Sequence, residues 1–419
     1  MPLRYRAPRG TQDILPEEQP YWDYVREAAQ RLCRLFGYER IDTPVFEVAA
    51  LFIRTTGEAT DIVQKEMYVF KDRGGQEMAL RPEGTAPVCR AYLEHGLASR
   101  PRPLRLWYWA PIFRYDRPQA GRYRQHHQFG VEALGDASPA MDAEVIELLW
   151  LFYRELGLEG LSIHLNSLGD ERCRPRYVEE LRRYYQGRLE GACPDCRARY
   201  HRNPLRLLDC KRDECQPLVA AAPPITDYLC QECLDHFEEL QQHLRVLEIP
   251  YVLNPRLVRG FDYYTRTVFE VYPPQEGAQS AVGGGGRYDR LVEGLGGPPT
   301  PAVGFGTGIE RIILNLKRQE VAIPPSPRPQ VYVAWQGAEA RLPAVRLASQ
   351  LRRQGVAAMA ATSTRSLKAQ MRQADARGIP YVAILGPQEV AEGTVTLRRL
   401  ADGHQERVPR DQLATRLMV

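Results

Sequence analysis

The chain has 419 residues, a formal net charge of +4 and nine cysteines. This length is enough for two or three domains with sizeable cores. So small a net charge gives no global basic field, so any nucleic-acid contact must depend on local patches. No apolar run is long enough to span a membrane, and the first residues, MPLRYRAPRGTQDILP, lack an apolar signal core. We therefore expect a cytoplasmic protein without membrane association, whose cysteines are reduced thiols or metal ligands.

The N-terminal part is predicted to form a helix followed by short strands. Apolar residues at helical spacing indicate a helix from about Glu17 to Phe36. Residues 38–47 are strand-like but contain Pro44, which lacks the amide that a central strand needs and so favours a sheet edge or an interface. Met67–Phe70 and Met78–Leu80 are predicted to pair as a hairpin.

The next segment, LRPEGTA at residues 80–86, indicates a strand, a turn and a helix that runs to about His95. Thr85 is the predicted cap of that helix. Glu83 and Thr85 are thus displayed at a strand-to-helix junction, either as binding groups or as ordinary capping groups.

The stretch Pro111–Ala133 is predicted to form two antiparallel strands joined by a loop at Pro118–Gly121. Alternation places Gln128 and Glu132 on one face of the second strand and Phe129 on the other. An arginine-rich loop above these side chains could hold an anionic group at one end and a cationic group at the other. The alternative is a solvated hairpin.

Beyond it, Met141–Leu156 is predicted to be an amphipathic helix and Leu161–Leu165 a strand. Residues 170–243 are helical in pattern, rich in arginine and cysteine-bearing, which indicates a separate helical insert. A strand at Thr267–Tyr272 precedes the run SAVGGGGRYDRLV at residues 280–292. Its four glycines indicate either a close backbone approach at a binding surface or a flexible loop, and the flanking strand and helix patterns favour the surface.

Glycines also alternate along the strand that precedes the helix beginning near Glu310, at Gly304, Gly306 and Gly308. This pattern lacks the Walker lysine and the Rossmann spacing, so alone it is weak support for a nucleotide site.

Residues 322–329, AIPPSPRP, form a proline-rich linker, which we interpret as a domain boundary. Strand and helix patterns then alternate, which predicts a small α/β domain with a largely parallel sheet. The predicted elements are strands at 331–334, 356–360, 381–385 and 394–400 and helices at 339–353, 366–377 and from Pro409. Because no nucleophile–base pair is evident, a binding module is the better interpretation.

Two C-x-x-C pairs in a chain with reduced cysteines are typical of a tetrahedral Zn²⁺ site. The candidate ligands for one structural ion are Cys193, Cys196, Cys210, Cys215, Cys230 and Cys233. At most four of them could serve, and the alternative is a set of reduced cysteines in the insert. Cys33, Cys89 and Cys173 are interpreted as buried small side chains.

Five segments carry a resemblance to a known family: LRPEGT, FRYDRP, LVRGFDYYTRT, GGGGRYD and GFGTGIERI. Together they resemble histidyl-tRNA synthetase, a class II aminoacyl-tRNA synthetase, over essentially the whole chain. LVRGFDYYTRT and the GGRYD element are the histidine-specific signatures.

The resemblance implies an α+β fold whose antiparallel catalytic sheet spans residues 1–169 and 250–321. It also implies a helical insertion domain at 170–249, a linker at 322–329 and an α/β anticodon-binding domain at 330–419. Members of the family are homodimers whose interface contains the proline that matches Pro44. This agrees with the sheet-edge interpretation of that segment.

The implied reaction joins L-histidine to ATP as histidyl-adenylate and then transfers histidine to tRNA(His), with Mg²⁺ as cofactor. It needs two anions brought together and the developing charge spread, for which arginines suit better than a general base. On the resemblance, Arg259 is the catalytic cation, Arg114 contacts the α-phosphate, Arg311 holds the terminal phosphate and Arg122 covers ATP. Asp116, Gly306 and Gly308 complete the ATP-binding set.

The same resemblance assigns the histidine pocket. Glu83, Thr85 and Gln128 match residues that hold the amino end, and Glu132 and Tyr264 match those on the ring. Tyr263 and Tyr288 line the pocket, while Arg114 and Arg259 also contact the amino acid. A polar pocket of this kind can reject apolar amino acids by ~10⁴ or more without editing.

Two positions depart from the family pattern: Asp116 stands where glutamate is usual, which puts its part in reading adenine in question, and His126 where an aromatic residue is usual. Two other functions compete. A non-catalytic, histidine-binding regulatory paralogue of the synthetase would lack the C-terminal domain and catalytic residues that this chain retains. A plain nucleic-acid-binding protein would not account for the paired histidine signatures.

Overall fold

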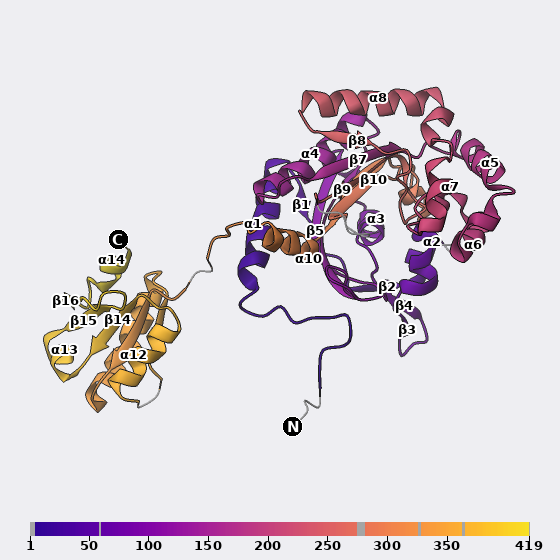
Figure 1. The fold of residues 1–419 in the computed structure, drawn as a ribbon. Coiled ribbons are helices and arrows are strands. Elements are labelled where there is room, and N and C mark those ends of the chain that lie inside the picture. The colour runs from indigo at the N-terminus through magenta and orange to yellow at the C-terminus, as the bar shows by residue number, and fades with distance from the viewer. Residues whose placement is uncertain (1–4, 58–59, 275–280, 326–327, 363–364, 419) are drawn as a thin grey trace. The chain divides into compact units, whose positions relative to one another are not determined.

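The computed structural model describes residues 5–57, 60–274, 281–325, 328–362 and 365–418 (Figure 1). Residue 280 of the predicted glycine-rich segment and residues 326–327 of the predicted linker lie outside these ranges. Contacts divide the chain into two units, Met1–Pro324 and Pro325–Val419. Among the described helices, none combines the length and apolar character that a membrane crossing requires.

An eight-stranded sheet forms the centre of the first unit, in the order β1-β5-β6-β11-β10-β9-β7-β8. The strands are β1 (Glu39–Arg40), β5 (Leu104–Phe113), β6 (Gln125–Leu134), β7 (Ser162–Ser167), β8 (Tyr251–Leu253), β9 (Thr265–Tyr272), β10 (Gly283–Arg287) and β11 (Ala302–Gly308). The pairs from β5 to β7 are antiparallel, and only β1 and β8 at the edges pair in parallel. The predicted α+β class with an antiparallel central sheet is confirmed.

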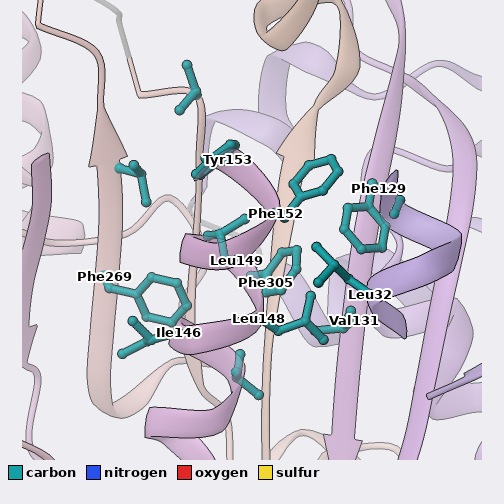
Figure 2. Packing of buried hydrophobic residues seen from close by; sticks show 14 of the residues in the cluster. Leu32, Phe129, Val131, Ile146, Leu148, Leu149, Phe152, Tyr153, Phe269 and Phe305 are labelled. Atoms are coloured by element: carbon teal, nitrogen blue, oxygen red, sulfur yellow. The ribbon is translucent and has the colours of Figure 1, made fainter. Parts of the chain in front are cut away.

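Three helices cover one face of this sheet and bury the main core. They are α1 (Gln19–Leu35), α4 (Pro139–Glu155) and α10 (Ile309–Arg318). Figure 2 shows Phe129, Phe305 and Phe269 from three strands packed against Phe152 and its neighbours on α4. Because side chains alternate along a strand, burying Phe129 turns Gln128 and Glu132 to the opposite face.

Smaller elements lie beside that opposite face. A three-stranded antiparallel sheet has the order β2-β4-β3, and β3 and β4 form the predicted hairpin. The elements are β2 (Phe46–Val48), α2 (Ala49–Thr56), a π-helical turn (Ile62–Glu66), β3 (Val69–Lys71), β4 (Glu77–Leu80), α3 (Thr85–Glu94), a 3₁₀ turn (Leu97–Ser99) and α9 (Leu291–Gly294).

The helical insert interrupts the sheet between β7 and β8. Its helices are α5 (Arg174–Tyr185), α6 (Pro194–Arg202), α7 (Gln216–Ala220) and α8 (Gln231–Val246), with 3₁₀ turns at Leu189–Gly191, Pro204–Leu207, Asp213–Cys215 and Ile225–Tyr228. In Figure 1 α5, α6 and α7 gather at one side of the unit, near α2.

A buried polar cluster joins the insert to the sheet. His236 on α8 contacts Asp142 on α4 at 2.7 Å, and the same carboxylate pairs with the fully buried Arg287 at 2.6 Å. Burial opposes ionisation of Asp142, but Arg287 and His236 outweigh it and lower the pKa of that carboxyl. Because the buried Asp142 carboxylate must keep its ion pair and hydrogen bonds, this cluster fixes the position of α8 against α4.

The second unit has its own core around a five-stranded sheet of order β13-β12-β14-β15-β16. Its elements are β12 (Val331–Trp335), a 3₁₀ turn (Ala338–Ala340), α11 (Arg341–Arg353), β13 (Ala358–Ala360), α12 (Leu367–Ala376), β14 (Tyr381–Leu385), α13 (Pro387–Glu392), β15 (Thr394–Arg399), β16 (Gln405–Pro409) and α14 (Leu413–Met418). The sheet is parallel only from β13 to β14; β15 and β16 are antiparallel. The prediction of a largely parallel sheet was therefore wrong for β15 and β16. Strand β16 was not predicted, because this edge strand buries only Val408 and lacks the apolar alternation by which strands are recognised.

Candidate active site

A pocket of about 1420 Å³ opens on the sheet face that the core helices leave uncovered. Thirteen of the fourteen residues predicted to bind histidine or ATP line it: Glu83, Thr85, Arg114, Asp116, Arg122, Gln128, Arg259, Tyr263, Tyr264, Tyr288, Gly306, Gly308 and Arg311. The fourteenth, Glu132, lies just beneath the surface and contacts two of them. The structure thus gathers residues from segments more than 200 positions apart.

The floor of the pocket is made of glycines on adjacent strands. Gly304 on β11 lies opposite Glu132 on β6, and Gly284 and Gly286 on β10 lie opposite Gly306 and Gly304. A Cβ at Gly304 would approach Glu132 Oε2 to 2.0 Å. The glycine run is therefore strand β10 itself rather than a loop, and its missing side chains leave room for polar groups of the neighbouring strands.

Glu83 and Thr85 form the junction between β4 and α3. The buried Glu83 carboxylate accepts backbone N–H bonds from Thr85 at 2.6 Å and Ala86 at 2.8 Å. The predicted cap was wrong, because Glu83 satisfies the first amides of α3 and the Thr85 hydroxyl donates instead to Glu132 Oε1 at 2.7 Å. Burial raises the pKa of Glu83.

Glu132 is the most deeply buried carboxyl of the pocket, at 1 % exposure. It accepts hydrogen bonds from Thr85 and from the hydroxyl of Tyr288. Burial raises the pKa of Glu132 from 4.5 to about 8, although both hydroxyls favour the ionised form. Glu132 can therefore change protonation when a basic ligand enters.

Gln128 lies on the same face of β6, four residues before Glu132. Its Oε1 atom is buried and has no hydrogen-bond partner among the described residues. A Cβ at Gly306 would lie 2.4 Å from Gln128 Nε2, so that glycine makes room for the amide. An unpaired buried acceptor costs free energy, and a cationic donor in the pocket would satisfy it.

Arg259 lies at the other side of the floor. Its guanidinium forms an ion pair with Glu270 on β9 and lies 5.7 Å from the ring centre of Tyr264. Burial lowers the pKa of Arg259, but Glu270 outweighs burial, so the net pKa is raised and the group stays charged. Tyr263 stacks on Phe261 with 5.1 Å between ring centroids, which gives the pocket an aromatic wall.

Three further arginines converge above the sheet. Arg114 donates to Pro82 O at 2.8 Å, and Arg311 donates to Gly121 O at 2.9 Å and Ala281 O at 2.6 Å. Arg122 pairs with Asp116. Burial first, and then Arg122 and Arg114, lower the pKa of Arg311, so the three guanidinium groups lie close enough to repel one another and an anion among them would offset that repulsion.

His126 lies near two of these arginines. Burial, Arg114 and Arg311 lower its pKa to about 3, so its imidazole is neutral at ordinary pH. It adds a flat, uncharged surface among the arginines, suited to stacking rather than to charge recognition.

Tyr108 and Glu270 are among the pocket residues that the sequence analysis did not identify. The ring of Tyr108 on β5 fills the space that a Cβ at Gly84 or Gly130 would need. Glu270 on β9 pairs with Arg259. Both lie on the pocket side of strands, with Tyr108 opposite Gly130 and Glu270 opposite Gly284. Alternation along β5 and β9 could have found them.

The candidate metal ligands fall into two places in the insert. The ligand atoms of Cys193, Cys196, Cys210 and Cys215 lie within 4.8 Å of one another. Cys230 and Cys233 lie in a separate group with Asp170 and Cys173. The structure therefore divides the six predicted cysteines, and Cys173, although buried as expected, belongs to a group of candidate ligands.

Comparison with known proteins identifies the family. A family model described as Histidyl-tRNA synthetase matches residues 10–170 and 197–312. The chain belongs to the histidyl-tRNA synthetase family. It is 57% identical over 410 residues to a histidine–tRNA ligase of Dehalococcoides mccartyi, with 98% of each chain covered. It is 50% identical over 404 residues to one from Pelotomaculum thermopropionicum, covering 96% of this chain and 95% of the other.

A solved structure agrees with both units. The chain resembles apo histidyl-tRNA synthetase of S. aureus with a TM-score of 0.84 and 36% identity, covering 99% of this chain and 100% of the other. The second unit matches a family model described as Anticodon binding domain over residues 330–418. The predicted family and the predicted anticodon-binding domain are confirmed.

Proposed function

We propose that the chain ligates L-histidine to tRNA(His) through a histidyl-adenylate intermediate, with ATP converted to AMP and diphosphate. The observation that carries this is the pocket itself. The pocket brings the acceptor side chains of Glu83, Gln128 and Glu132 together with the guanidinium groups of Arg114, Arg259 and Arg311. The pocket can therefore hold a cationic amino group and an imidazole beside a polyanion, in a chain whose relatives carry the name histidine–tRNA ligase.

Histidine binds over the glycine floor. Glu83, Thr85 and Gln128 hold its α-amino group, which supplies a donor to the unpaired Gln128 Oε1. Glu132 and Tyr264 meet the two imidazole nitrogens, with Tyr263 and Tyr288 on the sides. A raised Glu132 pKa lets the carboxyl lose its proton as an imidazole N–H becomes its hydrogen-bond donor.

ATP binds beside the arginines. Arg114 and Arg259 contact the α-phosphate, Arg311 the terminal phosphate, and Arg122 closes over the nucleotide. Asp116 is held ready by Arg122 near the base, and Gly306 and Gly308 let ATP lie close to the strand. Mg²⁺ enters with ATP, since it is commonly bound through phosphates and one or two carboxylates, and Glu270 and Glu310 line the pocket.

The first step is attack by the histidine carboxylate on the α-phosphorus. The α-phosphorus–oxygen bond to diphosphate breaks as the new one forms, and Arg259 and Arg114 stabilise the charge on the phosphoryl oxygens. A hydroxyl of the 3′-terminal nucleotide of tRNA(His) then attacks the histidyl carbonyl, AMP leaves with the electron pair, and the hydroxyl proton passes to a phosphate oxygen of the departing AMP. Arg259 needs no proton transfer in either step.

The alternative, a non-catalytic histidine-binding regulator, finds less support. Such a protein has no need of phosphate-binding groups, yet Arg114, Arg259 and Arg311 all line the pocket. The presence of the second unit, with its match to an anticodon-binding model, also favours the ligase.

The functional molecule is a homodimer that works in the cytoplasm. Support for the dimer comes from the sheet that follows Pro44, where apolar side chains face solvent: Val45, Phe46, Val48, Val69 and Phe70. Phe46 is 53% and Phe70 43% exposed, and their ring centroids lie 6.3 Å apart in an edge-to-face arrangement. A contiguous exposed apolar patch of this kind is typical of an interface.

Histidine-dependent ATP–diphosphate exchange tests the proposal, with wild type compared with Arg259→Ala. We expect wild type to exchange and the variant to lose at least ~10²-fold in kcat, about 2.7 kcal/mol of transition-state stabilisation, while it still binds histidine. Arg245→Ala, on the exposed side of α8, is the matched control and should retain full exchange. If wild type bound histidine but showed no exchange, the chain would be a non-catalytic histidine-binding regulator instead.

A further inference from the structure

The insert holds two compact groups of metal-ligand side chains that the proposed reaction does not use. We propose that each group binds one structural Zn²⁺ ion, so that the insert carries a four-cysteine site and a separate site made of three cysteines and an aspartate. The first comprises Cys193, Cys196, Cys210 and Cys215, and the second Asp170, Cys173, Cys230 and Cys233.

The spacing of the sulfurs fits one tetrahedral ion per group. With Zn–S bonds of about 2.3 Å, tetrahedral geometry puts neighbouring sulfurs about 3.8 Å apart. Cys193 Sγ lies 3.8 Å from Cys210 Sγ, and Cys215 Sγ lies 3.9 Å from Cys196 Sγ. All four residues are buried, so four thiols converge where an apolar core would have placed hydrocarbon.

The second group brings three sulfurs and one carboxylate oxygen within 4.8 Å of one another. Asp170 Oδ1 lies 3.7 Å from Cys173 Sγ and 3.9 Å from Cys230 Sγ. The other carboxylate oxygen, Oδ2, accepts from Arg172 at 2.8 Å and lies 3.6 Å from Arg266. Three thiolates and one carboxylate around Zn²⁺ leave a net charge of −2, which these two guanidinium groups offset. Both carboxylate oxygens are thus held by Arg172, Oδ2 by its guanidinium and Oδ1 by its backbone N–H at 3.0 Å, as ligating carboxylates are commonly hydrogen-bonded.

The local backbone supports ligation in both groups. Each C-x-x-C begins a helix, with Cys193 as the N-cap of α6 and Cys230 as the N-cap of α8. Backbone amides point at sulfur, from Cys193 N to Cys215 Sγ at 3.2 Å and from Asp170 N to Cys173 Sγ at 3.3 Å. Helix N-termini and amide donors stabilise thiolates, and soft thiolate ligands in a tetrahedral set suit zinc and disfavour magnesium and calcium.

The two sites would hold the insert against the catalytic loop. The second site joins the start of the insert to its last helix, and Arg174 beside it donates to Tyr264 O at 2.5 Å. Near the first site, Arg206 donates to Arg259 O at 3.1 Å and Asn203 to Asp262 at 2.9 Å. The insert's short helices α6 and α7 bury few apolar side chains of their own. Bound metal ions would supply the stability that so small a core does not.

The family match does not cover all of these ligands. Its two matched segments stop at residue 170 and resume at residue 197, so Cys173, Cys193 and Cys196 fall between them. Support for the metal sites therefore comes from the positions of this chain's own side chains.

The test is the zinc content of the full, tag-free chain, purified with a thiol reductant and measured by mass spectrometry of the metal. We expect two zinc ions per chain for wild type and for the control Cys33→Ser. Cys193→Ser with Cys196→Ser should leave one ion, Cys230→Ser with Cys233→Ser should leave one, and all four changes should leave none. Unchanged zinc in the Cys230/Cys233 variant would overturn the second site, and metal-free wild type would overturn both.

A measurement on wild type alone guards against variants that fail to fold. Cadmium exchanged into the protein should give two cadmium NMR signals, one typical of four sulfurs and one shifted upfield by an oxygen ligand. A single signal would contradict two sites of different composition. An intact mass that rises by four hydrogens on reduction, with peptide mapping that places both bonds among Cys193, Cys196, Cys210 and Cys215, would show that the first group forms disulfides instead. Chelation should also expose the insert to proteolysis several-fold faster.

Discussion

The buried Glu132 shows how one residue adapts a sheet surface to its ligand. Among the described residues, its carboxyl is hydrogen-bonded by hydroxyl groups rather than by a cation, and burial raises its pKa to about 8, so it is largely protonated near neutral pH. A bound imidazole N–H would stabilise its ionised form. This agrees with the general tendency of functional sites to hold groups with perturbed pKa values.

Glu132→Gln tests that burial through the pH dependence of stability. Because the folded-state pKa of about 8 exceeds the ordinary value of 4.5, the folded protein holds a proton that the unfolded chain releases. Wild type should therefore lose stability relative to Glu132→Gln as pH rises through this window, by on the order of a few kcal/mol, since each pKa unit corresponds to about 1.4 kcal/mol.

Urea unfolding at several pH values measures this difference. Glu238→Gln, on the exposed side of α8, controls for the removal of a charge as such. A Glu132→Gln stability difference that stays flat from pH 4.5 to 8 would contradict the account.

At the residue scale, most of the pocket could be predicted from motifs, because each motif displays its polar side chains at a strand end or along one strand face. Contacts between side chains on different strands could not be predicted in this way. The pairing of Arg259 with Glu270 and the contact of Glu132 with Tyr288 depend on register, which no single segment specifies. The second cysteine group escaped for the same reason, since Asp170 and Cys230 are brought together only by the folded insert.

Among the secondary-structure elements, β11 acts as a spacer, by which we mean that it leaves room for the side chains of the neighbouring strand β6. Its glycines remove side chains where Gln128 and Glu132 from β6 must stand above the sheet. The sequence pattern predicted the alternation but not its purpose, because the neighbouring strand lies far away in the chain. Likewise, β16 could not be predicted, since an exposed edge strand needs few apolar residues.

Gly306→Ala tests the spacer role. The new Cβ would lie 2.4 Å from Gln128 Nε2, so the amide must move while the fold is retained. We expect the KM for histidine to rise roughly tenfold or more, which corresponds to about 1.4 kcal/mol of lost binding. Steady-state exchange kinetics measure it.

Gly294→Ala is the matched control, because nothing lies within 4 Å of the position that its Cβ would take. Its KM should equal that of wild type. If Gly306→Ala also left the KM unchanged, β11 would not set the position of Gln128.

On the scale of the whole molecule, the apolar face of the β2-β4-β3 sheet predicts assembly. Phe46→Glu places a charge in the middle of the exposed patch, where burial against a second copy would leave it unpaired. We expect sedimentation to show wild-type dimers and a variant dissociation constant at least ~10²-fold weaker, equivalent to roughly 2.7 kcal/mol.

Leu342→Glu provides the comparison, since Leu342 is 77% exposed on α11 of the second unit. That variant should sediment as wild type does. Undiminished dimerisation of Phe46→Glu would place the interface elsewhere, and a monomeric wild type would remove it.

Charging of a tRNA(His) transcript by the purified chain shows whether this pocket makes histidyl-tRNA. With ATP and Mg²⁺ present, we expect histidine to be attached to the tRNA and AMP and diphosphate to be released in equal amounts. Replacing histidine with an apolar amino acid should lower the rate by ~10⁴ or more, because the pocket's buried polar groups would be left unpaired. Histidine binding without AMP release or charged tRNA would contradict the account and make the chain a sensor of histidine.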